Sequence, residues 1–331
     1  MTRAKKWKIF FFIFGVAILG WMVYATGIDK IWQNVKETGL WFIPIIGVWI
    51  VVYLLNALAS YSIIRDKNTP KECLPSFGKV MKVTISGFAI NYITPVVALG
   101  GEPYKIIELQ ENLGSHKATS AILSHSMMHI LSHLVFWIVS TFLIVFILNP
   151  SWAIIVGCAV MCLIFCFVLY YIFVGYRKGL IVKTFRVLGK IPIVKKWAKK
   201  FSQEKLQSLQ EIDQNIVTLY TKRKPTFFWA LLLEISARVV SCFELYFIAK
   251  AVGTNMTVLD SIVLYAGSTL FANILFFSPM QLGTREGGLA LTLNMMGIRA
   301  GLGVYMGLVM RIRELFWIGI GLILMRIKKS K

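Results

Sequence analysis

The chain has 331 residues, of which 57% are hydrophobic and only 15% charged, and its formal net charge is +21. A soluble domain of this length would bury a core with far less apolar material, and the alternating apolar and polar residues of a membrane β-barrel are absent. The basic residues cluster at the ends of apolar runs, which argues against a nucleic-acid-binding surface. The composition therefore predicts an all-α, polytopic integral membrane protein.

Several apolar runs approach or exceed the roughly 20 residues that a helix needs to cross a bilayer. The first run is followed by no small-residue cleavage site, so we interpret it as a retained anchor and not as a signal peptide. Two further apolar stretches are interrupted by Pro, Gly and charged residues. The six predicted full spans are 8–26, 40–64, 118–148, 151–176, 226–250 and 300–327, and the interrupted stretches are 78–102 and 258–297.

The distribution of Lys and Arg predicts the orientation, because cytoplasmic loops carry an excess of basic residues. Basic residues gather in the N-terminal RAKKWK, in 65–82, in 177–225 and in the C-terminal RIKKSK. With these segments, Lys105 and Lys117 in the cytoplasm, 28 of the 36 basic residues lie inside and four outside. We therefore expect a multi-pass protein of the plasma (cytoplasmic) membrane with both termini in the cytoplasm.

The two interrupted stretches do not cross the membrane in this orientation. The stretch 78–102 starts and ends on the cytoplasmic side, and the stretch 258–297 starts and ends outside. Irregular backbone at membrane depth is tolerated only where protein or a water-filled cavity surrounds it. Both stretches are therefore predicted to be re-entrant helical hairpins that line a polar cavity.

The hairpins carry related motifs, PVVALGGEPYK at 95–105 and FFSPMQLGTREGG at 276–288, and in both a Glu follows a Pro by seven residues with Gly in between. Each half of the chain consists of two spans, a hairpin and a span, in opposite orientations. This order predicts an inverted-topology repeat with a site near the midplane. The motif residues are Pro95, Gly100, Gly101, Pro103, Pro279 and Gly283.

The chain is predicted to form a single membrane domain, 1–331, with a first repeat at 1–148 and a second repeat at 151–331. The second repeat contains the insertion 177–225, which has 13 Lys and Arg residues against three acids. We interpret the insertion as amphipathic helices on the inner leaflet, where basic clusters attract anionic lipid. Ordinary topology-fixing charge is the alternative explanation.

Charged residues inside membrane spans are costly and usually face the interior of a helix bundle. Glu234 and Arg238 are four residues apart, in the favourable order for an ion pair on one helix face. Arg311 and Glu314 are also neighbours on one face. Arg313 points elsewhere and has no partner on its own helix, so as a buried cation it needs an anion from another source.

Three histidines, His125, His129 and His133, share one face of the span 118–148. They suit a proton relay, a metal ladder or the polar lining of a cavity. Three imidazoles along one helix are too far apart to hold one ion together, and no carboxylate lies in the same run. No metal site and no cofactor is therefore predicted.

The stretch NYITPVVALGGEPYK and the stretch FFSPMQLGTREGG, followed by a final span with Arg, resemble the flippase-like transmembrane domain family. This is the family of the N-terminal membrane domain of lysylphosphatidylglycerol synthase. The resemblance implies movement of lipids between leaflets. Two-domain members add a soluble synthase that attaches an amino acid to phosphatidylglycerol, and this chain ends at RIKKSK without one, so we expect no such enzyme activity.

Other relatives are linked to polyprenyl-phosphate sugar pathways, so the resemblance leaves the lipid open. It also contains a departure, because the span after the first motif carries His where family members often have Arg or acidic residues. The expected partners are membrane lipids, either an anionic phospholipid or a polyprenyl phosphate, with a homo-oligomer as a further possibility and nucleic acid excluded.

The expected mechanism uses two helices that begin near Pro103 and near Gly287, because helix N-termini bind anions readily. His129 follows Glu102 by 27 residues, as Arg313 follows Glu286. This equal spacing puts His129 and Arg313 at equivalent places of the repeat. The predicted substrate-binding residues are Glu102, Lys105, Arg285, Glu286, Arg313 and His129.

Two other functions remain open from the sequence. A secondary transporter of a small anion or ion can use the same inverted scaffold. A membrane-embedded enzyme acting on lipid headgroups needs a nucleophile or a metal set beside the carboxylates, and the chain has no HExxH and no aspartate-rich metal motif. Lipid translocation through a midplane site is the function that the sequence favours.

Overall fold

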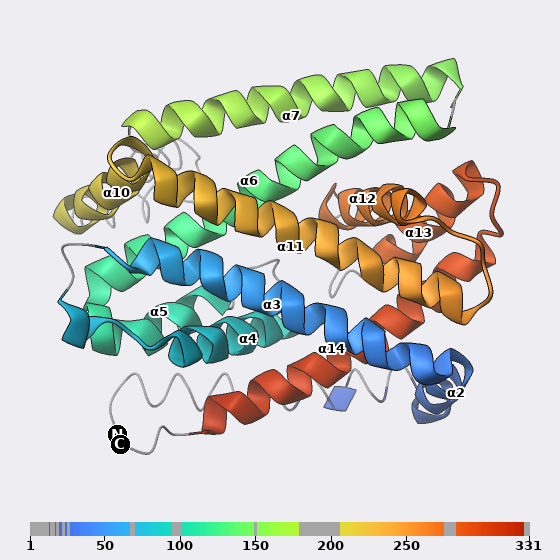
Figure 1. Cartoon of the computed structure of the whole chain (residues 1–331), viewed down its shortest axis with the longest axis horizontal. Coiled ribbons are helices and arrows are strands. Elements are labelled where there is room, and N and C mark those ends of the chain that lie inside the picture. The colour runs from blue at the N-terminus through green and yellow to red at the C-terminus, as the bar shows by residue number, and fades with distance from the viewer. Residues whose placement is uncertain are drawn as a thin grey trace, which may run out of the picture.

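A computed structural model describes residues 27–66, 70–94, 101–148, 151–178, 206–274 and 283–327, together with five single positions between 13 and 24. Across these ranges the regular structure is helical, and the described residues contain no strand (Figure 1). The all-α prediction is confirmed. The first predicted span, 8–26, and most of the insertion 177–225 lie outside the described residues.

Two long helices, α3 (Phe42–Ile64) and α11 (Lys224–Ala251), pack side by side through the middle of the molecule (Figure 1). They are antiparallel, because Arg223 at the start of α11 donates to the carbonyl oxygen of Ile63 at the end of α3 over 3.1 Å. Both helices are apolar over most of their length. They form the axis against which the remaining helices pack.

Two further long helices contact this axis, α6 (Ser115–Leu148) and α14 (Gly301–Arg326). Among the described elements, helix α7 (Trp152–Lys178) packs mainly along α6 and α10 (Leu206–Thr221), and much of its apolar surface is exposed. The short helix α2 (Ile28–Thr38) precedes α3 and lies at the opposite end of the molecule from α10 (Figure 1).

Four short helices form two pairs at opposite ends of the α3–α11 axis (Figure 1). The first pair is α4 (Phe77–Ile93) with α5 (Gly101–Leu113), and the second is α12 (Val258–Ile274) with α13 (Thr284–Met295). At about 1.5 Å per residue each is shorter than the roughly 30 Å of a bilayer core. The connections between the paired helices, with Pro95, Gly100 and Pro279, lie outside the described residues.

The second limb of the first pair is longer than the sequence predicted. The apolar stretch was expected to end at residue 102, whereas α5 continues to Leu113. Lys105 and Glu108 interrupt the hydropathy of this limb, yet both are buried. A search for apolar runs misses such a segment, because it counts every charged residue as evidence against burial. A charged side chain can still be buried where neighbouring protein groups, and not water, neutralise it.

Glycines allow the short helices to approach their neighbours closely. A Cβ on Gly321 of α14 would lie 2.4 Å from the Cβ of Ala89 on α4, and a Cβ on Gly303 would lie 2.6 Å from the backbone nitrogen of Ala290 on α13. Real Cβ atoms do not approach other atoms this closely. Each short pair is therefore locked onto α14 by a position that only glycine fills without moving a helix.

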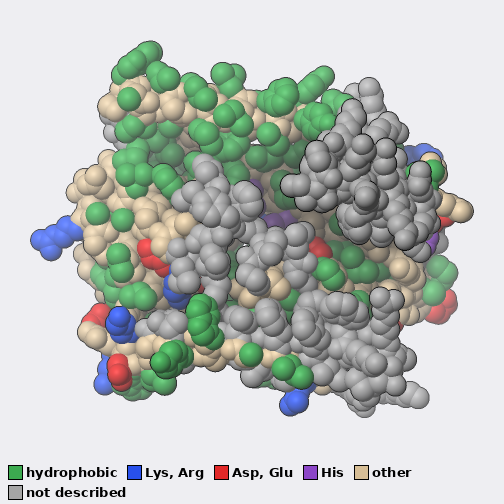
Figure 2. All heavy atoms as spheres, turned by 180° about the vertical axis from the view of Figure 1, so that it is seen from behind, with side chains coloured by type: hydrophobic (Ala, Val, Ile, Leu, Met, Phe, Trp, Pro, Cys, Tyr) green, Lys and Arg blue, Asp and Glu red, His purple; other side chains and the backbone are tan. Residues whose placement is uncertain are grey.

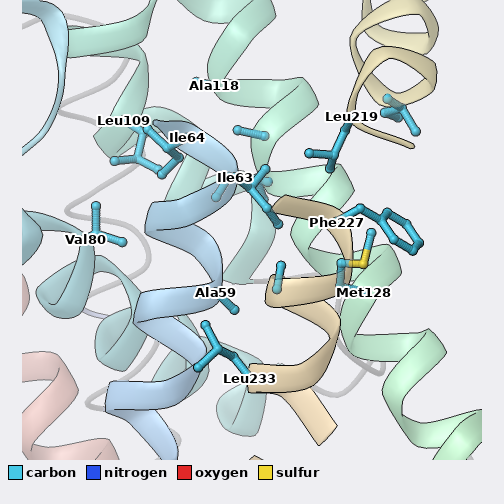
Figure 3. Packing of buried hydrophobic residues seen from close by; sticks show 14 of the residues in the cluster. Ala59, Ile63, Ile64, Val80, Leu109, Ala118, Met128, Leu219, Phe227 and Leu233 are labelled. Atoms are coloured by element: carbon cyan, nitrogen blue, oxygen red, sulfur yellow. The ribbon is translucent and has the colours of Figure 1, made fainter. Parts of the chain in front are cut away.

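The largest hydrophobic core lies at the end of the axis where α10 and α11 meet (Figure 3). Between membrane helices such side chains stabilise the contact mainly by van der Waals packing, because lipid tails are as apolar as the side chains themselves. The cluster joins six helices, so it fixes α4, α5 and α6 relative to the axis. Its labelled members are Ala59, Ile63, Ile64, Val80, Leu109, Ala118, Met128, Leu219, Phe227 and Leu233.

Three helical stretches of the described residues are long and apolar enough to cross a membrane, namely 28–64, 115–147 and 152–174. They contain or match the predicted spans 40–64, 118–148 and 151–176. Helices α11 and α14 reproduce the predicted spans 226–250 and 300–327 in length, with 28 and 26 residues. Both carry several charged residues, which lower their hydropathy.

Candidate functional site

Arg313 of α14 and Glu244 of α11 form a buried, two-pronged ion pair. Arg313 Nε lies 2.6 Å from Glu244 Oε1, and Nη2 lies 2.8 Å from Oε2. Trp49 of α3 donates its indole N–H to Glu244 Oε2 over 2.9 Å, and the guanidinium lies 3.8 Å above the Trp49 ring. The two charged side chains are only 1% and 0% exposed. The anion that a buried Arg313 needs is therefore Glu244.

Two more ion pairs join α13 to α14. Arg285 bonds Glu314, and Arg311 bonds Glu286, with Nη2 and Nε of Arg311 at 2.7 and 2.8 Å from Oε1. Glu286 also accepts the backbone N–H of Gly283 at the start of α13 over 3.0 Å. The sequence placed Arg311 beside Glu314 on one helix, but the structure gives each an ion pair with α13. These pairs run between helices because α13 packs along the charged face of α14.

A third group lies between α6 and α11. Glu234 Oε2 lies 2.8 Å from His129 Nδ1 and 3.7 Å from Arg238 Nη2, so the predicted Glu234–Arg238 neighbours are confirmed. Arg238 Nη2 is 2.6 Å from the ring nitrogens of His129. His125 Nε2 lies 3.0 Å from Glu234 Oε1 and 3.2 Å from the Asn56 carbonyl oxygen. The shorter contact is within ion-pair distance, although Glu234 Oε1 has no hydrogen-bond partner among the described residues.

The first hairpin motif forms a fourth, looser group. Lys105 Nζ lies 3.6 Å from Glu102 Oε1 and 4.9 Å from the centre of the Phe88 ring. Asn91 of α4 accepts the backbone N–H of Gly101 at 2.8 Å and approaches Glu102 Oε1 with its amide at 3.5 Å. Glu102 Oε2 is buried and has no hydrogen-bond partner among the described residues.

Aromatic rings connect these groups at the middle of the molecule. Tyr53, the central residue of α3, packs against Trp49, Phe88 and Trp317 with ring centroids 5.7, 5.5 and 4.9 Å away. Phe88 in turn lies 5.7 Å from the His129 ring. A row of rings therefore runs from Arg313, over Trp49 and Tyr53, to Phe88 beside Lys105 and His129.

Contacts with α3 show where two of the charged groups lie along this helix. Trp49, which binds Glu244, is about 6 Å from the midpoint of α3 along the helix, and Asn56, which meets His125, is about 5 Å from it on the other side. A midplane location was the central expectation for the predicted site. Within the described residues the ion pairs lie on both sides of the centre of α3.

The six predicted site residues are spread over all four of these groups. Glu102 and Lys105 lie together, His129 is separated from Lys105 by Phe88, and Arg285, Glu286 and Arg313 lie on or beside α13 and α14. The helices begin close to the predicted points, at Gly101 and Thr284. Their first N–H groups are already bonded to Asn91 and Glu286, which weakens the expected anion site at the helix ends.

The structure adds partners that the sequence analysis did not include in the site. Glu244, Glu314 and Arg311 were visible as charges inside spans, and the need for charge neutrality signalled that each has a partner. Trp49, Phe88 and Asn91 carried no such signal, because aromatic and amide residues are common in membrane helices. The tertiary structure alone assigns them.

One face of the molecule exposes part of this region. Figure 2 shows histidine side chains in a hollow near the middle of that face, with hydrophobic side chains above it. His129 is 26% exposed on its side chain, whereas His125 is 4% exposed. His133 contacts the rings of His129 and Trp137, and its buried Nδ1 has no partner among the described residues. Across the described ranges no group of three or more His, Cys, Asp or Glu is arranged to hold a metal ion.

Long apolar helices around a buried set of ion pairs define an integral membrane protein of the helical-bundle class. The chain matches the profile of the lysylphosphatidylglycerol synthase TM region over residues 8–321, so it belongs to this family. The resemblance that the two hairpin motifs indicated is confirmed. Neither the search of curated proteins nor the search of solved structures found a match.

Proposed function

We propose that this protein moves an anionic lipid, either a phospholipid or a polyprenyl-phosphate-linked lipid, between the two leaflets of the plasma membrane. The observation that carries the proposal is the position of the ion pairs on both sides of the midpoint of α3. Ionisable residues at this depth are expensive and mark substrate pathways in membrane proteins. A protein that only spans the membrane has no need of them.

The position of the bilayer follows from the two ends of α3. At one end, α2 buries Asn34 and Thr38 against the protein and exposes the apolar Ile28 and Trp32. An amphipathic helix whose apolar side is exposed suits the boundary between headgroups and acyl chains. At the other end the basic Arg65 follows the helix, and Arg223, at the start of α11, donates to the carbonyl oxygen of Ile63. The 23 residues of α3 cover about 35 Å between these levels, close to the thickness of a bilayer core.

The arrangement of the short helices supports two re-entrant hairpins within an inverted repeat. The packing α3–α4, α4–α5 and α5–α6 in the first half has the counterparts α11–α12, α12–α13 and α13–α14 in the second. The halves also exchange contacts, α4 with α14 and α12 with α6. We therefore propose six spans with cytoplasmic termini, and two hairpins that enter from opposite sides and meet the midplane.

The chemistry of the site favours a phosphate headgroup. Buried Arg and Lys side chains next to displaceable carboxylates can exchange one anion for another, while the lipid tails stay in the bilayer. Arg313 is held by two short bonds, so it is poorly placed to release Glu244. Lys105 is held by one contact of 3.6 Å. We assign the headgroup contact to Lys105, with Glu102 and His129 beside it, and no chemical change of the lipid.

The test uses proteoliposomes with a fluorescent phosphatidylglycerol and, as a neutral control, a fluorescent diacylglycerol with the same tails. Exchange of the anionic probe between leaflets should exceed that of protein-free vesicles at least tenfold. Lys105→Met should abolish most of this gain, whereas Lys30→Met, on the exposed face of α2, should not. Transport of inorganic phosphate without lipid exchange would favour an anion transporter, and a chemically altered lipid would favour an enzyme.

A further inference from the structure

Glu102 is held less firmly than the other buried carboxylates of the candidate site. Glu234, Glu244 and Glu286 each have a basic side chain within 2.8 Å. The nearest basic group to Glu102 is Lys105 at 3.6 Å, and Oε2 has no hydrogen-bond partner among the described residues. Its side chain is nevertheless only 16% exposed. One oxygen of this carboxylate is therefore available for a new bond.

Lys105 is equally open to a new partner. The residue is 3% exposed, and Glu102 is the carboxylate with which it forms an ion pair in the described part of the chain. Its other close neighbour is the face of the Phe88 ring, which attracts a cation without donating or accepting a proton. An ammonium group has three donors. The contacts of Lys105 with described residues therefore leave donors for an anionic oxygen that replaces the long contact with Glu102.

We propose, building on the proposed lipid translocation, that Glu102 takes up one proton for each negative charge that Lys105 binds. Lys105 and Glu102 are together neutral. Adding a phosphate with one negative charge would leave a net negative charge in a medium of low dielectric constant, where like charges repel strongly. Protonation of the Glu102 carboxylate to the carboxylic acid restores neutrality. Lys105 then pairs with the phosphate, and the new O–H donates from the vacant oxygen.

The described groups around Glu102 differ from it in chemistry or in how they are held. The neighbour on α4 is Asn91, which does not titrate. Helix α5 contributes Lys105, the ion-pair partner of Glu102, and two further buried titratable residues, Tyr104 and Glu108. The nearest titratable group on α6 is His129, which lies behind Phe88 and is held by Glu234 and Arg238. In the second hairpin the same step is blocked, because Glu286 is bonded to Arg311 and to the Gly283 N–H.

The consequence is electroneutral co-transport of one proton and one lipid charge. A neutral loaded site does no work against the membrane potential, whereas a pH difference drives the lipid towards the alkaline side. One pH unit supports up to a tenfold ratio of lipid between the leaflets at equilibrium. Release of the lipid on that side frees the proton, and Glu102 returns to Lys105.

The experiment imposes a one-unit pH gradient on proteoliposomes that contain fluorescent phosphatidylglycerol equally in both leaflets. For the wild type, the probe should accumulate several-fold in the leaflet on the alkaline side. Glu102→Gln cannot take up the proton, so whatever exchange of the probe it retains should not respond to the gradient. Glu111→Gln on the exposed side of the same helix is the matched control and should behave as the wild type.

A second measurement tests the same step without transport. Short-chain phosphatidylglycerol is added to the detergent-solubilised protein in weak buffer, and a pH dye should report about one proton taken up for each lipid bound, and none in Glu102→Gln. Two results in the wild type would overturn the inference: lipid exchange that does not respond to the pH gradient, and lipid binding without proton uptake. Either result would still be compatible with the proposed function. No exchange above protein-free vesicles refutes both.

Discussion

The two hairpins start from the same sequence pattern and use it in opposite ways. In the second, Glu286 serves twice, since it accepts the first N–H of its helix, from Gly283, and binds Arg311. In the first, Asn91 of α4 accepts the N–H of Gly101 at the start of α5. The second carboxylate is committed to structure. The first is left with one weak ion pair and an unused oxygen.

A single position on the following helix accounts for much of this difference. Arg311 follows Glu286 by 25 residues, and the residue at the same distance from Glu102 is Met127. Met127 packs against the large hydrophobic core and has no charge to offer Glu102. Within the proposed inverted repeat, we therefore expect one half to act as a rigid clamp while the other keeps a charged pair that can exchange partners.

The tightest pair of the second half should show the largest effect. Glu244→Gln leaves the buried Arg313 without its carboxylate, and breaking a buried pair costs about 3–5 kcal/mol. The expected result is a large fall in the thermal unfolding midpoint in detergent and in the yield of folded protein. Glu244→Gln combined with Arg313→Met should recover much of the loss, because both charges are then absent. An unchanged midpoint in the single variant would refute the clamp.

The two motif carboxylates should differ in the same assay. Glu286→Gln removes a short charged contact with Arg311 and should cost about 2–3 kcal/mol. Glu102→Gln should cost less than about 1 kcal/mol, because its contacts are long and weak. Equal losses of stability in the two variants would contradict the division into a clamp and an exchanging pair.

Substitution of the two motif glycines, Gly101 and Gly283, should destabilise the protein for different reasons. A Cβ on Gly101 would lie 2.2 Å from the carbonyl oxygen of Gly87, so Gly101→Asn should push α5 from α4 and cost about 1–3 kcal/mol. Gly283 has open space but a φ of 79°. Asn tolerates this left-handed conformation, so Gly283→Asn should cost clearly less. Measured unfolding midpoints that rank the two variants the other way would show that the crowding at Gly101 is relieved elsewhere.

A small effect is expected at the cap of the first hairpin. Asn91→Ala removes the acceptor for the Gly101 N–H and should cost about 1 kcal/mol, a typical value for a lost cap. Asn91→Asp retains the acceptor and serves as the control. If Glu102 moves in to cap the helix, Asn91→Ala should also slow lipid exchange more than Asn91→Asp does. A loss of stability with unchanged exchange would mean that Glu102 stays beside Lys105.

The sequence alone determined the class, the family and the boundaries of the long helices. Long apolar runs have few ways to bury their backbone groups other than as helices. The same reasoning predicted α11 and α14 in spite of their charges, and it selected Glu102, Lys105, Arg285, Glu286, Arg313 and His129 as a set. Spacing along one helix was also enough to predict the Glu234–Arg238 neighbours.

The tertiary structure decided which charged residues form ion pairs with one another. Arg313 looked unpartnered because Glu244 lies 69 residues away in the chain, and Arg311 and Glu314 pair with α13 and not simply along their own helix. Periodicity reports the face that a residue occupies on its own helix, whereas the partner depends on how two helices pack. The unequal roles of Glu102 and Glu286 follow from such packing, because Asn91 and Arg311 reach the hairpins from other helices.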